Sequence, residues 1–260
     1  MRAAVLREHG EPLEITDVEP PDPAPHGVVV DVEACGVCRS DWHAWQGHGE
    51  WVGETVADGQ ILGHEPAGRV VAVGDRVGRV AEGDRVAVPF NLGDGSCPQC
   101  LRGHGNVCED GLALGFQREA QGAFAEQVHV PDADYNAMQL PDGVSARDMA
   151  ALGCRFMTAF HALTARGDVG AGDWVAVHGC GGVGLSTVHI ADALGARVVA
   201  VDIRDLVTRR VGATAGGAVF LAVELHRPVP LVVHDPNRHT VSIPSDCWWC
   251  ERTVLDECRS

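Results

Sequence analysis

The sequence predicts a protein of the α/β plus β class, in which antiparallel strands come first and a parallel sheet follows. Short strands separated by glycine turns fill residues 1–145, a pattern typical of an antiparallel β barrel. The pattern changes near Pro141–Gly143, and residues 174–202 then give the order strand, glycine loop, helix, strand. This order is a βαβ unit, from which parallel sheets are built. We therefore expect a barrel domain over 1–145 and a partial parallel-sheet domain over 146–215, and leave 216–260 unassigned.

The expected barrel consists of short strands rich in valine. Residues 1–19 alternate well enough for one or two strands, and 28–34 has the sequence Val-Val-Val-Asp-Val-Glu-Ala. Residues 68–73 and 85–88 give two more strands. Two Gly-Asp-Arg-Val turns punctuate this region.

Helices and strands alternate in the second part of the chain. Residues 144–164 carry apolar side chains at helical spacing. A strand at 174–178 precedes the glycine loop, and a strand at 197–201 follows the next helix. Strands are also expected at 217–223 and 229–234, while prolines interrupt the remaining sequence.

Composition narrows the kinds of partner. A chain of 260 residues is long enough for two modest domains. The net charge of −16 argues against nucleic acid and against an anionic membrane surface. No apolar run approaches the roughly 20 residues of a membrane span, and the N-terminus becomes charged too early for a secretory signal. Because several of the 10 cysteines are separated by two residues, we expect metal ligands in a reducing cytoplasm rather than disulfides.

A glycine loop follows the strand at 174–178. It matches G-x-G-x-x-G, and Asp202 ends the next strand at about the 20-residue spacing of the dinucleotide fingerprint. Glycines let a pyrophosphate approach the backbone, and the helix N-terminus attracts its charge. Asp202 would accept hydrogen bonds from a ribose and repel a 2′-phosphate, so we expect NAD rather than NADP. The predicted contacts are Gly179, Gly181, Gly182, Val183, Gly184 and Asp202. The alternative is a tight turn without a ligand.

Four ordered motifs carry a family resemblance: Cys35–His43, Gly63–Gly74, Gly153–Phe156 and Gly179–Gly184. In this order they resemble the zinc-dependent alcohol dehydrogenases of the medium-chain dehydrogenase/reductase family, and the match continues as far as Ala213. The resemblance implies a GroES-like β barrel as catalytic domain, followed by a Rossmann sheet that binds NAD.

The resemblance also implies ligands for a catalytic zinc, namely Cys38, His64 and Cys154. Two thiolates and one imidazole are a ligand set typical of an open, catalytic zinc site. Such an ion polarises an alcohol oxygen and favours hydride release to the nicotinamide. Arg39 is implied as a contact of the cofactor pyrophosphate.

Further residues around this metal receive roles by resemblance. Ser40 passes the alcohol proton toward solvent, with the cofactor ribose and His43 as later steps. Asp41 and Glu65 orient His64 and tune the charge of the zinc. In some family members the residue that matches Glu65 approaches the metal itself.

A second zinc site is expected within residues 94–108. Cys97, Cys100 and Cys108 match three of the four cysteines of the family's structural zinc lobe, and Asp94 stands at the first position. A carboxylate ligates zinc at a similar distance, but its harder oxygen binds less strongly than a thiolate. We predict a site of one aspartate and three cysteines; the alternative is an empty site with three free thiols.

The motif match ends at about residue 215, and family members are considerably longer. Residues 216–260 are either an out-of-frame or otherwise altered end, or a genuine alternative C-terminus. We favour the first, because a cofactor sheet cut after two strands leaves an unpaired edge. Half of the NAD pocket, and the dimer edge of the family's homo-oligomers, would then be missing.

Three functions remain open at this point. The first is a zinc-dependent oxidoreductase that transfers a hydride between a small alcohol, or the matching aldehyde or ketone, and NAD. The second is a catalytically inactive zinc-binding remnant of such an enzyme. The third is a relative that acts on polyols or amino alcohols, which the residues nearest the metal do not exclude.

Overall fold

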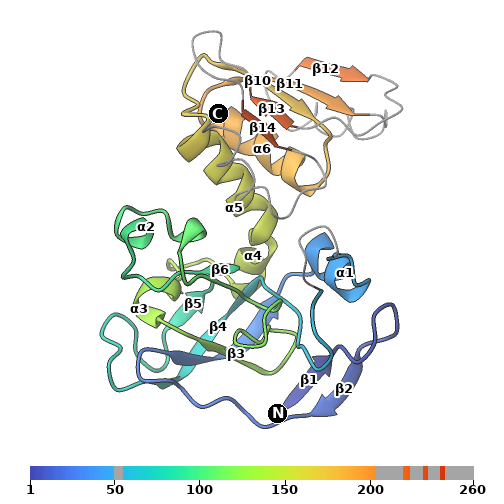
Figure 1. Cartoon of the computed structure of the whole chain (residues 1–260). Helices are drawn as coiled ribbons and strands as arrows, with labels where there is room; N and C mark the ends of the chain where they lie inside the picture. The colour runs from blue at the N-terminus through green and yellow to red at the C-terminus, as the bar shows by residue number, and fades with distance from the viewer. Residues whose placement is uncertain (50–54, 203–218, 223–230, 234–240, 244–260) are drawn as a thin grey trace. The chain divides into compact units, whose positions relative to one another are not determined.

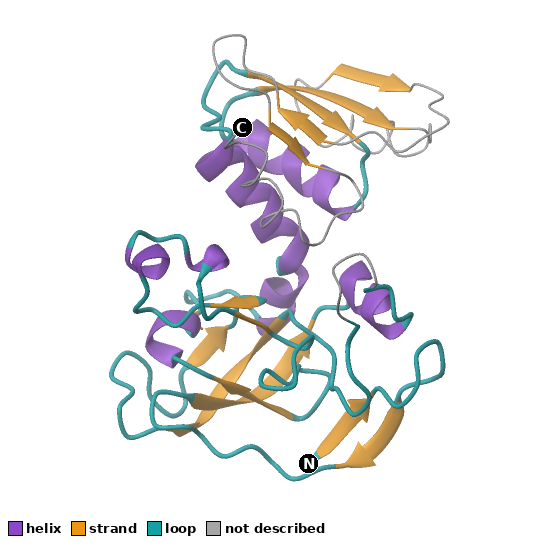
Figure 2. Cartoon of the chain, in the orientation of Figure 1, coloured by secondary structure: helices purple, strands orange, loops and turns teal. Residues whose placement is uncertain are grey.

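The computed structural model divides into two compact units (Figure 1), residues 1–154 and residues 155–260. Helices, strands and loops are distinguished in Figure 2. The structure describes residues 1–49, 55–202, 219–222, 231–233 and 241–243, and of the last three segments only the backbone. Within these residues, no helix has the length and apolar character needed to cross a membrane.

The first unit is built on antiparallel strands. They are β1 (Arg2–Val5), β2 (Glu14–Asp17), β3 (Val28–Cys35), β4 (Pro66–Val73), β5 (Arg85–Ala87), β6 (Asn91–Leu92), β7 (Leu112–Ala113), β8 (Gln127–Val130) and β9 (Met138–Gln139). Five of them form one sheet in the order β8-β3-β4-β5-β9, and β1-β2 and β6-β7 form two pairs. All these pairings are antiparallel, as the sequence predicts.

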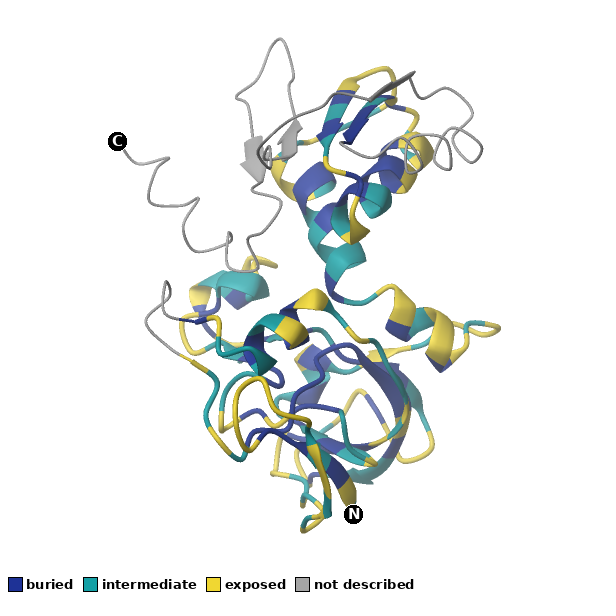
Figure 3. Ribbon diagram, turned by 90° about the vertical axis from the view of Figure 1, so that its right-hand side faces the viewer, coloured by how far each residue is buried: buried dark blue, intermediate teal, exposed yellow. Residues whose placement is uncertain are grey.

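Alternating valines explain the central strands of this sheet. Val28 and Val30 of β3 are fully buried and pack with Val70 of β4 and Val86 of β5. Residues that alternate along a strand point to one face, so this face becomes the core of the first unit. Buried residues, dark blue in Figure 3, follow these strands. The strands expected at 28–34, 68–73 and 85–88, and the pair expected within 1–19, are confirmed.

The described part of the first unit contains the short α-helices α1 (Arg39–Trp45), α2 (Pro98–Leu101), α3 (Ala133–Asn136) and α4 (Ala146–Ala151), and a 3-10 helix at Gly105–Val107. Helix α4 packs on the sheet, because Ala146 is buried against Ala67 and Ala87. The small side chains let α4 approach β4 and β5 closely. The first unit therefore extends to Cys154, beyond the boundary expected after residue 145.

The second unit alternates helices with strands. Its elements are α5 (Cys154–His161, which starts at the last residue of the first unit), a π-helical turn (Ala162–Arg166), β10 (Trp174–His178), α6 (Gly182–Ala193), β11 (Arg197–Asp202), β12 (Val219–Ala222), β13 (Leu231–Val233) and β14 (Val241–Ile243). The sheet order is β12-β11-β10-β13-β14. The first three strands in this order run parallel, while β13 is antiparallel to β10 and to β14.

The βαβ unit expected over 174–202 is confirmed as β10, α6 and β11. Val175 and Val177 of β10 are fully buried and pack against Val188 of α6. Strands β12 and β13 fall within the strands expected at 217–223 and 229–234, whereas β14 was not expected from a region rich in proline. The remaining residues of the unassigned segment 216–260 lie outside the described residues.

Candidate metal and cofactor sites

Helix α1 positions the first candidate ligand. Cys38 is the N-cap of this helix, and Asp41, three residues later, accepts a hydrogen bond from the Cys38 backbone N–H at 2.8 Å. The same buried carboxylate accepts hydrogen bonds from the Gly63 N–H at 3.1 Å and from His64 Nδ1 at 2.9 Å. Asp41 therefore ties the start of α1 to the loop before β4. Because His64 uses Nδ1 for Asp41, its Nε2 is the ring nitrogen that faces a metal.

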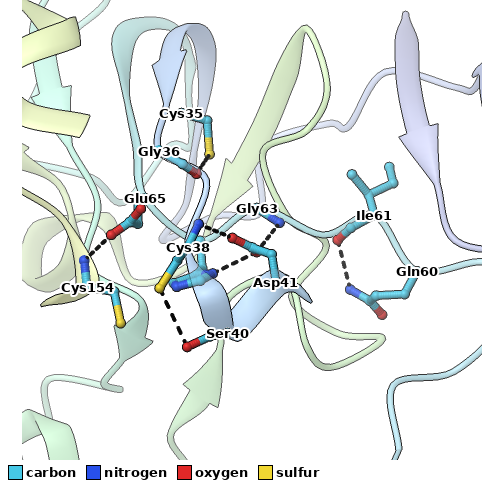
Figure 4. Close-up of polar contacts among 11 residues, drawn as sticks. Cys35, Gly36, Cys38, Ser40, Asp41, Gln60, Ile61, Gly63, Glu65 and Cys154 are labelled. Carbon is cyan, nitrogen blue, oxygen red and sulfur yellow. Dashed lines mark hydrogen bonds and ion pairs between the residues drawn. The ribbon is translucent and has the colours of Figure 1, made fainter. Parts of the chain in front are cut away.

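The three predicted zinc ligands meet within the first unit. Donor atoms of Cys38, His64, Glu65 and Cys154 all lie within 4.8 Å of one another, and we call these four residues the Cys38 cluster. Figure 4 shows Cys38, Glu65 and Cys154 approaching from different segments of the chain. Ser40 Oγ lies 3.6 Å from Cys38 Sγ, so the predicted proton-transfer residue borders the cluster.

Glu65 is held between two glycines. Its Oε1 accepts a hydrogen bond from the Cys154 backbone N–H at 2.5 Å. A Cβ on Gly153 would lie 2.6 Å from the Cβ of Glu65, and a Cβ on Gly36 would collide with its carboxylate. Asp41 thus orients His64, whereas Glu65 contacts the backbone of Cys154. The individual motifs do not indicate this contact, because Glu65 and Cys154 are 89 residues apart.

The thiols and the imidazole of the cluster shift one another's pKa. Hydrogen bonding to Cys154, and then to His64, lowers the pKa of Cys38 to about 3 despite burial. Hydrogen bonding to Cys38, together with burial, raises the pKa of the Cys154 thiol far above its usual range. Burial lowers the pKa of His64, but hydrogen bonds to Asp41 and Cys38 outweigh it and raise the value to about 9. One sulfur of the cluster is therefore an anion at neutral pH.

The donor chemistry of the Cys38 cluster fits a zinc ion. Two sulfurs, an imidazole nitrogen and a carboxylate oxygen within 4.8 Å are the atom types that zinc binds. The candidate ligand His64 also has the Asp41 carboxylate on its Nδ1, an arrangement that fixes the ring and strengthens it as a donor.

A second cluster lies in the loop that contains α2. Donor atoms of Asp94, Cys97, Cys100 and Cys108, here called the Cys97 cluster, also lie within 4.8 Å of one another. All three cysteines are buried. Cys97 is the N-cap of α2, and its sulfur accepts a hydrogen bond from the Cys100 N–H at 3.4 Å. The structure thus brings together the four residues predicted for the structural zinc.

Asp94, a candidate ligand, also holds the loop through hydrogen bonds. Its Oδ1 accepts hydrogen bonds from the backbone N–H of Cys97 at 2.9 Å and of Ser96 at 2.8 Å. These bonds hold the pKa of Asp94 well below its usual range, so the carboxylate stays charged. An anionic oxygen beside three sulfurs fits a zinc ion.

Two neighbouring residues of α3 hold this loop. The buried Asn136 accepts from the Gly93 N–H at 3.0 Å and donates to the carbonyls of Gly93 and Pro131, both at 2.9 Å. The side chain of Tyr135 would lie 2.7 Å from a Cβ on Gly93, through its ring, and 3.1 Å from a Cβ on Gly95, through its own Cβ. Neither residue was singled out from the sequence, because their role depends on the contact between α3 and the loop.

The glycine loop belongs to the second unit and lies between β10 and α6. The Gly179 N–H donates to the Val201 carbonyl at 2.7 Å, and the Cys180 N–H donates to Asp202 Oδ2 at 2.7 Å. A Cβ on Gly184 would collide with the Gly179 carbonyl, so glycine is required where α6 approaches the loop. The predicted residues Gly181, Gly182 and Val183 begin the helix or immediately precede it.

Arg39 and His43 lie on α1, in the first unit. The Arg39 guanidinium carbon is 5.3 Å from the centre of the Trp42 ring. His43 Nδ1 lies 3.1 Å from His48 Nδ1, and Trp42 contacts both imidazole rings. His48 was given no role from the sequence, because the chain brings it beside His43 only after α1 ends. The contact of Arg39 with a pyrophosphate remains a prediction, since the glycine loop is in the other unit.

Known proteins match both the sequence and the fold. Residues 24–142 match the alcohol dehydrogenase GroES-like domain. An alcohol dehydrogenase of Geobacillus stearothermophilus is 39% identical over 206 residues, which is 79% of this chain and 58% of the relative. An L-threonine 3-dehydrogenase of Burkholderia cenocepacia is 33% identical over 238 residues, which is 90% of this chain and 67% of the relative. The second match extends beyond residue 215.

Solved structures of alcohol dehydrogenases also resemble this chain in fold. The alcohol dehydrogenase TADH from Thermus sp. ATN1 superposes with a TM-score of 0.77 at 34% identity, over 88% of this chain and 65% of that one. A cobalt- and zinc-bound alcohol dehydrogenase from Pyrobaculum aerophilum gives a TM-score of 0.74 at 32% identity, over 85% and 65%.

The chain spans 58% of the length of the Geobacillus relative, and the residues that match the GroES-like domain include Cys38, His64 and Glu65 of the Cys38 cluster. By sequence and by fold, it belongs to the zinc-dependent medium-chain alcohol dehydrogenase family.

Proposed function

We propose that this chain takes part in zinc- and NAD-dependent hydride transfer between a small alcohol and the matching aldehyde or ketone. The Cys38 cluster carries the proposal, because its thiols, imidazole and carboxylate lie within 4.8 Å of one another. Cys38, His64 and Cys154 would hold the ion, with Glu65 beside it. When bound, zinc polarises the hydroxyl oxygen and NAD accepts the hydride.

Ser40 and His43 would move the alcohol proton. Ser40 is buried and borders Cys38, whereas His43 lies half-buried one turn further along α1. Residues three apart on a helix share a face. The Ser40 hydroxyl would therefore receive the proton in the water-poor site, and the imidazole of His43 would release it toward solvent.

The second unit would bind NAD as the first half of a Rossmann sheet. The order β12-β11-β10, with parallel pairings, supports this assignment, because the strand order of that half is 3-2-1. The hydrogen bond from the Cys180 N–H holds Asp202 at the carboxyl end of β11, where a ribose hydroxyl is recognised. The Cys97 cluster would hold a structural zinc that stabilises its loop without taking part in the reaction.

An amino alcohol is a second candidate substrate. The match to an L-threonine 3-dehydrogenase covers 90% of this chain, whereas the match to the Geobacillus alcohol dehydrogenase covers 79%. The Cys38 cluster suits either substrate class, because a zinc ion held there would polarise the hydroxyl oxygen of a simple alcohol and of an amino alcohol alike. Substrate choice then depends on the pocket around the ion.

The test combines metal content, cofactor binding and turnover on one purified protein. We expect two zinc ions per chain, saturable NADH binding by fluorescence titration, and NAD reduction with a member of a panel of primary alcohols, secondary alcohols and L-threonine. Cys38→Ala should lose one zinc and all turnover. Retained turnover in that variant would contradict the assignment, and zinc binding without saturable NADH binding would favour an inactive remnant.

A further inference from the structure

The side chain of Arg155 lies against the first residue of α6. A Cβ built on Gly182 would be 2.7 Å from Arg155 Cδ, 3.7 Å from its Cβ and 3.8 Å from its Cγ. The aliphatic stem of Arg155 therefore passes over the position that any larger residue at 182 would occupy. Both residues belong to the second unit.

This contact brings the stem of a cationic side chain to the phosphate end of the candidate nucleotide site. Gly182 follows the loop at the carboxyl end of β10 and starts the 12-residue helix α6. The first N–H groups of a helix point out of its N-terminus and favour an anion there. A guanidinium whose stem covers that terminus adds charge and up to two parallel hydrogen bonds to the same anion.

The other described arginines of the second unit lie elsewhere. Arg166 ends the π-helical turn after α5 and is exposed. Arg197 begins β11, at the opposite end of the strand from Asp202, and its guanidinium carbon lies 5.5 Å from the Trp174 ring centre. The sequence contains no lysine. Among the described residues of this unit, Arg155 is thus the strongly basic side chain packed on the glycine loop.

We propose that Arg155 binds the pyrophosphate of the dinucleotide, which would be held between its guanidinium and the N–H groups at the start of α6. The proposal rests on the proposed function, because it assumes that this loop binds NAD. It gives the pyrophosphate a cation within the second unit itself. It also explains why residue 182 is a glycine, because a side chain there would displace the stem of Arg155.

The experiment compares NADH affinity in the zinc-loaded full chain and in three variants. Arg155→Met removes the charge and keeps an unbranched stem, Arg155→Lys keeps a charge without the fork, and Arg166→Met is the matched control. We expect the Kd for NADH to rise about 10–100-fold in Arg155→Met and less in Arg155→Lys, because charge-assisted bidentate bonds are the strong ones. The control should bind like the wild type.

A comparison of ligands with and without phosphates separates loss of the pyrophosphate contact from a general loss of folding. ADP-ribose should lose affinity for Arg155→Met as NADH does, whereas adenosine, which has no phosphate, should bind the variant and the wild type equally. If Arg155→Met bound NADH with the same Kd as the wild type, the role of Arg155 would be overturned while the proposed function would stand. The same holds for Arg155→Lys if the methionine variant does not fold. Equal losses for adenosine and NADH would also overturn the role of Arg155. Absence of saturable NADH binding by the wild type would overturn the proposed function as well.

Discussion

Asp41 connects three parts of the metal site through one carboxylate. It binds the backbone of Cys38 and Gly63 and the Nδ1 of His64. The sequence motif places Asp41 near Cys38, but only the folded chain brings it to His64. Its oxygens accept hydrogen bonds from the N-terminus of α1 and from His64. Its negative charge therefore stabilises both the start of the helix and the orientation of the imidazole.

Asp41→Asn should weaken zinc binding at the Cys38 cluster. The amide has one acceptor oxygen, so it cannot serve the Cys38 N–H and His64 at both oxygens as the carboxylate does. Loss of such a contact typically reduces metal affinity about 10–100-fold. Competition with a chromophoric chelator measures this change, and the exposed Asp75→Asn serves as control. Equal zinc affinities of the two variants would contradict the role of Asp41.

Asp94 gives a second test at the scale of one residue. In Asp94→Cys the Cys97 cluster gains a fourth thiolate, which is a softer donor for zinc. We expect a chelator to remove this zinc about 10-fold more slowly, with a higher Tm. Asp94→Asn should keep an acceptor for the Ser96 and Cys97 N–H groups but lose zinc more readily. An Asp94→Cys protein that binds no more zinc and melts no higher would argue against ligation by Asp94.

At the scale of elements, α3 holds the metal-binding loop in place. Asn136 bonds both the N–H and the carbonyl of Gly93, next to Asp94. The loop is therefore held in position by contacts with α3, independently of any metal. This explains how a site with one weaker ligand keeps its four donors together.

Asn136→Ala should destabilise the first unit by about 3 kcal/mol, because it leaves buried backbone groups without partners. Urea unfolding followed by the tryptophan fluorescence gives the free energy of unfolding. Gln139→Ala, on the exposed strand β9, should change it by less than about 0.5 kcal/mol. Similar values for both variants would show that α3 does not hold the loop.

The sequence predicts the helices and strands of this fold better than it predicts the contacts between them. Continuous valines predicted β3, and the order around the glycine loop predicted β10, α6 and β11, because burial of apolar residues dominates both patterns. The hydrogen bond from Cys154 to Glu65 and the hydrogen bonds between Asn136 and Gly93 join residues that are far apart in the sequence. Such contacts depend on how elements pack, which local spacing does not encode.

At the scale of the whole molecule, the two metal clusters belong to the first unit and the glycine loop to the second. The sequence motifs predict that the metal ligands and the glycine loop lie in different parts of the chain. The exception is Cys154, a candidate metal ligand that follows the predicted barrel domain. Helix α4, which follows the boundary expected after residue 145, packs on the sheet of the first unit. Strand β14 was missed because residues around it break the usual strand pattern.

Zinc binding at the Cys38 cluster should release two protons at pH 7. Before binding, His64 with a pKa of about 9 and Cys154 with its raised pKa are protonated, whereas Cys38 with a pKa of about 3 is not. Ligands must be deprotonated, so one proton leaves His64 and one leaves Cys154. Affinity should therefore rise about 100-fold per pH unit between pH 7 and pH 8 and fall as pH drops.

Calorimetry in buffers of different ionisation enthalpy counts these protons. The difference between the wild type and Cys38→Ala isolates the Cys38 cluster from the Cys97 cluster. Release of three protons would mean that Cys38 starts as a thiol, contrary to its lowered pKa. Release of none would mean that the ligands do not bind the ion.

The aspartate of the Cys97 cluster also changes how this loop would respond to oxidation. The cluster contains three cysteines, so one thiol is left over when two of them form a disulfide. The sulfurs of Cys97 and Cys108 lie 3.7 Å apart. If the ion were lost under oxidising conditions, these two could join as a disulfide, and Cys100 would remain a single thiol. Four cysteines could all pair within one chain. Here Cys100 would be left without a partner inside the cluster, so its oxidation would lead to a sulfenic acid or to a disulfide with a thiol from outside the cluster.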